Sequence, residues 1–220
     1  MKKTKIDWCD CTINPVVGCQ NGCKYCYGEK INNRFHIVKN WKLPEFFPEK
    51  LKQLKSKKPK SVFIDSMSDI GCWQQEWFNA VIKSINENSQ HRYIALTKRL
   101  DGLVNLISRA DTGVVRNLYI GTSITTQAQA NAIPIRGIIP DFYSIEPILE
   151  PVLIPDEMLA KTLIIGAETG NRKGKVIPQK KWITSLVEQA DRCNSILFMK
   201  ESLRKIMGDD FRQDMLPWAV

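Results

Sequence analysis

Seven short apolar runs, spread along most of the chain, constrain its fold more than any other feature. Most are rich in Val, Ile, Leu, Phe and Tyr, and their length suits strands that are buried on both faces. Amphipathic segments separate them, which is the pattern of parallel strand–helix–strand units. The runs are TINPVV (12–17), SVFID (61–65), RYIAL (92–96), LYIGT (118–122), FYSIE (142–146), TLIIG (162–166) and SILFM (195–199).

Helices are expected between these runs. Residues 75–89 and 180–192 each place apolar side chains on one face at helical spacing. Pro48 suits the first turn of another helix, which runs into a lysine-rich segment, and residues 201–218 also read as a helix. This order predicts an α/β fold, a partial (β/α) barrel of about six parallel strands, with a doubly wound open sheet as the competing architecture. No Pro/Gly/Ser linker divides the chain, so one domain over residues 1–220 is expected.

The segment NPVVGCQNGCKYCY, residues 14–27, carries three cysteines at the spacing C-x3-C-x2-C, namely Cys19, Cys23 and Cys26. Clustered thiols in a reducing compartment indicate a metal before a disulfide. Soft, anionic thiolates hold iron–sulfur clusters well. A [4Fe–4S] cluster has four irons, so three cysteines leave one iron free to take an external ligand.

Two glycines support a cluster-binding loop. Gly18 and Gly22 allow the chain to turn tightly, with backbone amides directed toward the sulfurs. The alternative is a zinc knuckle completed by Cys9, Cys11 or a distant residue. No His-x3-His pair and no second C-x2-C accompany the motif, so the iron–sulfur interpretation is favoured.

With Tyr25 before its last cysteine, the motif resembles the C-x3-C-x-aromatic-C signature of the radical S-adenosylmethionine superfamily. Further blocks resemble a phage- and mobile-element-associated radical enzyme family of unknown function that is similar to spore photoproduct lyase. The resemblance covers nearly the whole chain. The blocks are SVFIDSMSDI (61–70), IALTKRLDGL (94–103), LYIGTSI (118–124), YSIEPIL (143–149), LIIGAETGN (163–171) and LFMKESL (197–203).

This resemblance implies a radical S-adenosylmethionine domain with a [4Fe–4S] cluster on the three cysteines. S-Adenosyl-L-methionine would bind the open iron and be cleaved to a 5′-deoxyadenosyl radical, which takes a hydrogen atom from the substrate. Tyr25 and Tyr27 are expected near the adenine. Ser68 matches a serine that contacts the methionyl amino group, Lys98 a carboxylate-binding lysine, and Ser123 a second polar contact.

Ser66 belongs to the same cofactor-facing segment and marks a departure from spore photoproduct lyase. That enzyme carries a hydrogen-donating cysteine two residues before its cofactor-binding serine, where this chain has Ser66. A hydroxyl is a poor hydrogen-atom donor, so direct repair of spore photoproduct is not expected.

Charged residues follow several of the apolar runs. In (β/α) barrels the active site is built at the carboxyl ends of the strands. Asp69, Glu146, Glu168 and Lys200 stand at such positions and are the candidate catalytic residues. The alternative for Glu146, Glu168 and Lys200 is a structural ion network, because buried charges tend to pair.

The remaining cysteines, Cys9, Cys11, Cys72 and Cys193, are isolated in sequence. They could ligate an auxiliary cluster, but reduced thiols are the simpler interpretation, with Cys72 as a small apolar filler.

The chain carries 32 basic and 23 acidic residues, a net charge of +9, with six lysines between Lys50 and Lys60. Such an excess attracts polyanions. A glycine-rich loop with Arg172, Lys173 and Lys175 could contact phosphate. No apolar run approaches the ~20 residues that cross a bilayer, and no signal peptide is evident, so a cytoplasmic protein without a membrane partner is expected.

The sequence therefore predicts a radical enzyme that acts on a nucleic-acid base or nucleotide by modification, isomerisation or lyase chemistry. A peptide or small metabolite is the alternative substrate. A non-catalytic iron–sulfur or zinc module that binds nucleic acid is the second alternative. The radical reaction would also need a low-potential electron donor such as flavodoxin or ferredoxin.

Overall fold

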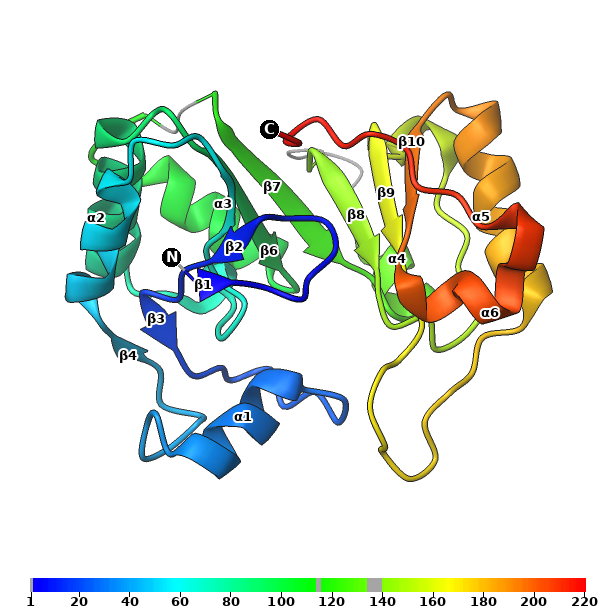
Figure 1. Ribbon diagram of the computed structural model, residues 1–220, viewed down its shortest axis with the longest axis horizontal. Coiled ribbons are helices and arrows are strands. Elements are labelled where there is room, and N and C mark those ends of the chain that lie inside the picture. The colour runs from blue at the N-terminus through cyan, green and yellow to red at the C-terminus, as the bar shows by residue number, and fades with distance from the viewer. Residues whose placement is uncertain (1, 114–115, 134–139) are drawn as a thin grey trace. The chain divides into compact units, whose positions relative to one another are not determined.

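The main sheet has eight strands in the order β1-β2-β5-β6-β7-β8-β9-β10 (Figure 1). The computed structural model describes residues 2–113, 116–133 and 140–220. A second, two-stranded sheet pairs β3 (Val16–Val17) with β4 (Glu45–Phe46). The strands of the main sheet are β1 (Lys2–Lys3), β2 (Cys11–Thr12), β5 (Ser61–Phe63), β6 (Arg92–Thr97), β7 (Leu118–Ser123), β8 (Phe142–Ile145), β9 (Thr162–Ile165) and β10 (Ile196–Met199).

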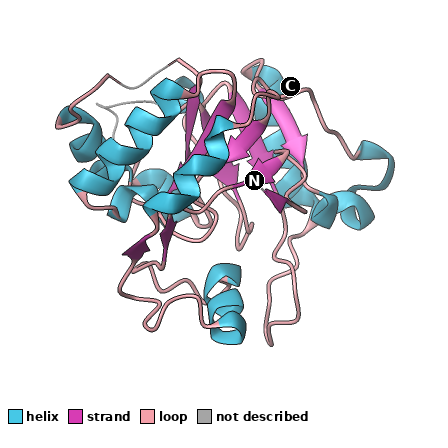
Figure 2. Ribbon diagram, turned by 60° about the vertical axis from the view of Figure 1, so that its left-hand side comes forward, coloured by secondary structure: helices cyan, strands magenta, loops and turns pink. Residues whose placement is uncertain are grey.

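Along the chain, helices follow most of the parallel strands. Figure 2 distinguishes the helices (cyan) from the strands (magenta). The pairs β2–β5, β5–β6, β7–β8, β8–β9 and β9–β10 are parallel, and β1 is antiparallel to β2. The partial (β/α) barrel expected from the sequence is confirmed. The α-helices are α1 (Tyr27–Phe35), α2 (Gln75–Glu87), α3 (Leu100–Ser108), α4 (Gln127–Asn131), α5 (Lys180–Arg192) and α6 (Arg204–Met207). The 3₁₀ helices are η1 (Pro48–Lys55), η2 (Ile70–Cys72), η3 (Asp156–Met158), η4 (Glu201–Leu203) and η5 (Gly208–Asp210).

The chain groups into two compact units, each with its own core. Unit 1 comprises Met1–Ile120 and Trp218–Val220, and unit 2 comprises Gly121–Pro217. In unit 1, α2 buries Phe78 and Ile82 against β5 and β6. In unit 2, α5 packs its apolar face against β8, β9 and β10. Burial of each large apolar side chain stabilises the fold by about 1.5–3 kcal/mol, and both predicted helices are confirmed.

The C-terminal helix predicted over residues 201–218 is confirmed only for its first half, where η4, α6 and η5 follow one another over residues 201–210. Gly208 has φ +59° and ends α6 after Met207. Beyond η5 the chain is extended, and Gln213 forms an antiparallel bridge to Phe198. An edge strand needs hydrogen-bond partners, and here the returning tail supplies them.

Two other predicted segments differ in detail. The run TINPVV is divided between β2 and β3 because Pro15 lacks an N–H for a strand ladder. The helix at Pro48 begins as predicted, but it is a 3₁₀ helix that ends at Lys55, before the last lysines of the run. Among the described residues, no helix combines the length and apolar character needed to cross a bilayer.

A contact between two glycines positions the loop that follows β5. A side chain at Gly71 would lie 2.2 Å from the Arg99 carbonyl oxygen, and one at Gly102 would lie 2.1 Å from the Gly71 carbonyl oxygen. The backbone of η2 therefore lies directly on the first turn of α3, at a distance that only glycine permits. This contact fixes Asp69, which caps η2.

Candidate functional site

The three cysteines of the motif lie on one loop between β3 and α1 in unit 1. Gly18 has φ +111° and Gly22 has φ +64°, so both turns of this loop use conformations that favour glycine. A side chain at Gly18 would also lie 2.8 Å from the Cα of Pro44. Cys26 is the N-cap of α1, and its sulfur accepts a hydrogen bond from Glu29 N at 3.4 Å.

The environment of the thiols suits a bound metal cluster. Burial raises the pKa of Cys19 to about 12, partly opposed by a backbone hydrogen bond from Asn21. Burial also raises the pKa of Cys26, opposed by the backbone amides of Glu29 and Gly28. These N–H groups stabilise the thiolate, which is the form that binds iron. A bound metal deprotonates a thiol outright, so the donor set and its amides fit an iron–sulfur cluster.

Within the described part of the chain, no three His, Cys, Asp or Glu side chains are arranged to hold a single metal ion. A cubic cluster makes a different demand, because each thiolate binds a separate iron. Cys19 and Cys26 both pack against an apolar group formed by Val17, Trp41 and Met67. This apolar group shields one side of the loop from water.

Hydrogen bonds connect the loop after β5 directly to the cysteine loop and to α1. Gly18 N donates to the Met67 carbonyl at 2.9 Å, and the Tyr27 hydroxyl donates to the Ser66 carbonyl at 2.6 Å. The side-chain oxygen of Asn14 accepts from Ser66 Oγ at 3.0 Å and from Met67 N at 2.9 Å. The structure therefore brings the predicted Tyr27 and Ser66 together.

Asp69 connects three segments of unit 1. Its Oδ1 accepts hydrogen bonds from Gly71 N at 3.0 Å and Thr97 Oγ1 at 2.5 Å. Its Oδ2 accepts from Asn21 Nδ2 at 2.5 Å and Lys98 N at 2.9 Å. Asn21 lies between Cys19 and Cys23, so this buried carboxylate ties the cysteine loop to η2 and to the end of β6.

Two more predicted cofactor residues meet beside this connection. The Lys98 ammonium lies 5.9 Å from the centre of the Tyr25 ring, in cation–π range. Ser68 Oγ accepts a hydrogen bond from Trp73 Nε1 at 3.0 Å. Tyr25, Ser68 and Lys98 therefore belong to the same part of unit 1 as the cysteines.

Sequence reasoning missed Asp65. Burial, followed by the nearby Asp69 charge, raises the pKa of this fully enclosed carboxyl well above its usual range. Its oxygens accept from Ile70 N at 3.2 Å and from Leu96 N at 3.1 Å and 3.3 Å. The available signal was an acid within the apolar run SVFID, where an unpaired charge would be costly.

The isolated cysteines take different places. None of the seven cysteines forms a disulfide in the described part of the chain, and Cys11 is buried in the core of unit 1. The sulfur of Cys72 lies 3.9 Å from Asn21 Oδ1, so it faces the cysteine loop. Burial raises the pKa of Cys72 to about 11. Whether any of these cysteines binds a second metal stays a prediction.

The other predicted catalytic residues lie in unit 2, at the carboxyl ends of β8, β9 and β10. Lys200 Nζ donates to Glu146 Oε1 at 2.5 Å. The two side chains meet over Gly166, where a Cβ would lie 3.1 Å from Lys200 and 3.3 Å from Glu146. Glycine on the middle strand therefore allows an ion pair between residues on alternate strands.

Glu168 is buried and pairs with a residue of the glycine-rich loop. Arg172 donates to both of its carboxylate oxygens, at 2.6 Å and 2.7 Å. Lys175 Nζ donates to the Gly170 carbonyl at 3.1 Å. Two of the three cations that we considered for phosphate contact thus have partners within their own loop.

Ser123 is the last residue of β7 and is buried beside Ser144 of β8 in the parallel register. The Ser144 hydroxyl is buried without a hydrogen-bond partner among the described residues. Ser144 and Glu146 are two residues apart along the chain, and residues at this spacing on a strand point to the same face of a sheet. The Ser144 hydroxyl therefore lies on the same face as the Glu146–Lys200 pair, one step before it in the direction of β8.

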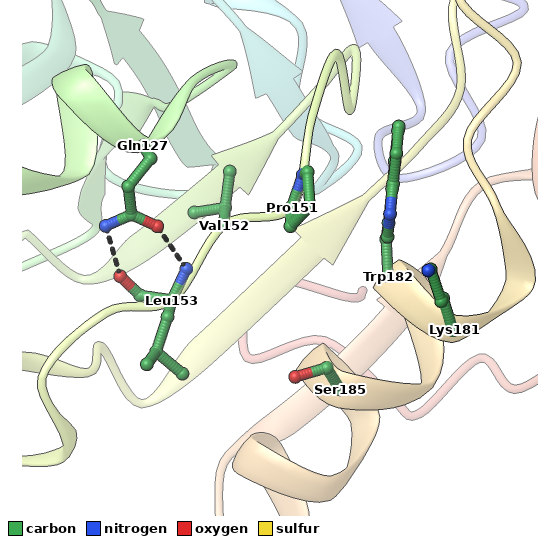
Figure 3. A pocket seen from close by; sticks show the side chains of 7 residues that line it. All are labelled: Gln127, Pro151, Val152, Leu153, Lys181, Trp182 and Ser185. Carbon is green, nitrogen blue, oxygen red and sulfur yellow. Dashed lines mark hydrogen bonds between the residues drawn. The ribbon is translucent and has the colours of Figure 1, made fainter.

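Unit 2 also contains a pocket of about 360 Å³ that none of the predicted site residues line (Figure 3). The Gln127 amide forms two hydrogen bonds with the Leu153 backbone on one side, at 2.7 Å and 2.9 Å. Trp182 and Lys181 of α5 stand on the other side (Figure 3). The pocket lining is mostly apolar.

One family model, described as "Protein of unknown function (DUF5131)", matches residues 3–206. No curated protein and no solved structure matches the chain. The chemistry of the site is therefore the main guide to its activity.

Proposed function

Because the chain belongs to the DUF5131 family, whose description assigns no activity, we propose a function from its own site. The protein is a radical S-adenosylmethionine enzyme that holds a [4Fe–4S] cluster on Cys19, Cys23 and Cys26. The observation that carries this proposal is the set of hydrogen bonds between the cysteine loop and the loop after β5. They gather the motif cysteines and most of the residues implied as cofactor ligands into one unit.

When bound, the cluster and S-adenosylmethionine would supply radical chemistry for hydrogen-atom abstraction from a substrate. The chain's own residues bind these cofactors and orient them. Cys19, Cys23 and Cys26 would hold the cluster through their thiolates. Tyr25 offers a ring face to the adenine, and the Lys98 ammonium beside it offers a charge to the carboxylate.

The loop after β5 completes the cofactor site. Ser68 presents its hydroxyl to the amino group, held in place by the Trp73 indole. Ser66 and Tyr27 tie this loop to α1. Asp69 has both oxygens engaged by four donors, so its role is to position the cysteine loop rather than to transfer a proton.

In unit 2, Glu146, Lys200 and Glu168 are proposed to bind the substrate. The Glu146–Lys200 pair offers a hydrogen-bond acceptor and a donor to a planar polar group such as the edge of a nucleobase. Glu168 holds Arg172, which stays partly exposed at the loop and can meet a phosphate. Ser123 was predicted as a cofactor contact, but it lies at the end of β7 in unit 2, so no hydrogen bond groups it with the other cofactor residues described above.

Nucleic acid is the proposed substrate class because of the charge distribution. The chain has a net charge of +9. Lys52, Lys55, Lys57 and Lys58 are all exposed in and after η1. Phosphates are attracted to such a surface by counterion release. A base within a duplex would have to be flipped out or single-stranded to enter a barrel.

The test is anaerobic reconstitution with iron and sulfide, reduction by dithionite, and addition of S-adenosylmethionine. Iron content and 5′-deoxyadenosine are then measured, the latter by mass spectrometry. Cys23→Ala removes one proposed ligand, and Cys193→Ala is the matched control in unit 2. We expect iron loading and 5′-deoxyadenosine from the native protein and Cys193→Ala, and neither at native level from Cys23→Ala.

The assay is repeated with single-stranded DNA, with RNA and with a peptide mixture. An increase in 5′-deoxyadenosine with nucleic acid alone supports the substrate class, and an increase with peptide alone refutes it. A loaded, reducible cluster that yields no 5′-deoxyadenosine with any of them contradicts the enzyme proposal.

A further inference from the structure

Helix α1 exposes the side chains that a surface helix normally buries. Tyr27, Ile31 and Phe35 lie four residues apart, on one face, and are 51%, 36% and 63% exposed. The side of α1 that packs inward carries Gly28 and Asn32. An amphipathic helix normally places its apolar stripe against the core, whereas α1 turns its apolar stripe toward the outside.

The inward face of α1 is well anchored, so its orientation is fixed. Asn32 exchanges two hydrogen bonds with the Val38 backbone, at 2.9 Å and 3.0 Å. A Cβ at Gly28 would lie 2.8 Å from the Trp41 ring. Rotation of the helix to bury its apolar stripe would break both contacts. Both ribbon views show α1 apart from α2 and α3 of the same unit (Figure 1, Figure 2).

The apolar stripe has a basic border. Ile37 and Leu43, which follow α1 in the chain, are also exposed, at 40% and 62%. Exposed apolar side chains grouped on one helix face mark an interaction site. Five exposed cations lie in this stretch of the chain, two of them on α1 itself, whereas Glu29 and Glu45 are the acidic residues between positions 24 and 45. The cations are Lys24, Lys30, Arg34, Lys39 and Lys42.

We propose that this surface, the α1 face, docks an acidic electron-transfer protein that carries a low-potential flavin or iron–sulfur group. The proposal rests on the proposed function, because a radical enzyme of this type needs an electron from outside to reduce its cluster. The donor gives up one electron to the oxidised cluster, and no bond forms or breaks. Cys26 caps α1, and nine residues of helix span about 14 Å, so a protein seated here lies close to the cluster.

Other occupants fit the surface less well. A second copy of the chain would bring two basic borders together, and like charges across an interface are unfavourable. Single-stranded nucleic acid needs open aromatic faces for stacking. Of the two aromatic rings in the stripe, Phe35 has the Arg34 guanidinium 5.2 Å from its centre, and Tyr27 is held by the hydrogen bond from its hydroxyl to the Ser66 carbonyl. The other exposed apolar side chains, Ile31, Ile37 and Leu43, are aliphatic.

The test compares two double variants. Ile31→Gln with Phe35→Gln removes two of the three apolar side chains of the stripe and keeps a good helix former at both positions. Tyr27 is left unchanged because it belongs to the proposed cofactor site. Leu153→Gln with Ile177→Gln removes side chains that are 58% and 69% exposed in unit 2, and is the matched control. Binding of oxidised flavodoxin is measured by fluorescence anisotropy, and cluster reduction by reduced flavodoxin and by dithionite is followed by absorbance.

For the α1 variant we expect binding of flavodoxin to weaken about tenfold or more, because anchor side chains dominate interface energetics. Its reduction by flavodoxin should slow similarly, while reduction by dithionite should be unchanged. The control variant should match the native protein, and added salt should weaken flavodoxin binding by the native protein.

Equal flavodoxin binding by the α1 variant and the native protein would overturn the proposal. The proposal would also be overturned if the native protein and the control variant formed a concentration-dependent dimer, or bound DNA, and the α1 variant did not. Dithionite-dependent 5′-deoxyadenosine with no binding of flavodoxin would overturn the docking site and leave the proposed function standing. Absence of a cluster would contradict the proposed function, and the anisotropy measurement would still decide the docking site.

Discussion

The Asp69 carboxylate is the contact whose removal tests the cysteine loop most directly. It is buried and accepts four hydrogen bonds. In Asp69→Asn the new amide nitrogen can turn toward the Thr97 hydroxyl, which can accept as well as donate, so only the bond from Gly71 N is lost. In Asp69→Ala all four donors lose their acceptor.

A hydrogen bond to a charged group contributes about 1.5–3 kcal/mol. Asp69→Asn should therefore lower the free energy of unfolding by about 2 kcal/mol. Asp69→Ala should lower it by about 4 kcal/mol, since water can enter the space and satisfy part of the donors. Both variants should still fold, because domains of this size are stable by about 5–15 kcal/mol.

Urea unfolding followed by far-UV circular dichroism measures these changes, with unchanged m-values as the sign that two-state behaviour is kept. Asp111→Ala is the matched control, because Asp111 is exposed and accepts a hydrogen bond from Asn79 at 2.6 Å. It should change stability by no more than ~0.5 kcal/mol. If Asp69→Ala costs no more than this control, the reasoning is refuted. Iron retention should follow the order native, Asp69→Asn, Asp69→Ala, because only Ala releases Asn21.

Further predictions concern thiol reactivity and backbone packing. Because burial raises the pKa of Cys19 to about 12, roughly one thiol in 10⁴ is ionised at pH 8 in the metal-free protein. Iodoacetamide should therefore label Cys19 slowly, and the labelling rate should rise about tenfold for each pH unit as the pH approaches that pKa from below. Labelling at the rate of an ordinary surface thiol would contradict this prediction. Gly166→Ala places a methyl group 3.1 Å from the Lys200 side chain; we expect a loss of about 1–3 kcal/mol in thermal unfolding, and an unchanged Tm would be inconsistent with it. Gly71→Ala places its Cβ 2.2 Å from the Arg99 carbonyl oxygen; we expect a loss of ~3 kcal/mol or more, and native stability would disprove the close approach.

Most of the regular structure could be predicted from local pattern. Parallel strands are buried on both faces, so their sequences are continuous apolar runs, and each predicted run after the first contains one strand. Helices α2 and α5 have apolar stripes that face a core, so periodicity located them.

Helix α1 was not predicted, although Tyr27, Ile31 and Phe35 recur at the spacing of one helix face. Periodicity shows that such a stripe exists but not which way it faces, and in α1 it faces outward while Gly28 and Asn32 face inward. The predicted C-terminal helix ends early for a different reason. Gly208 stops α6, and the tail then takes its hydrogen bonds from the edge of the sheet rather than from its own turns.

The sequence by itself determined the alternation of strands and helices and the spacing of three thiols on one loop, because both depend on residues close together along the chain. Only the tertiary structure decided what surrounds those thiols. Asn21 meets Asp69 across 48 positions, and Asp69 meets Thr97 across 28. Such contacts depend on which strand ends lie side by side, and on the backbone approach that Gly71 permits. A buried carboxylate needs all its donors at once, and no local pattern can specify donors from three separate segments.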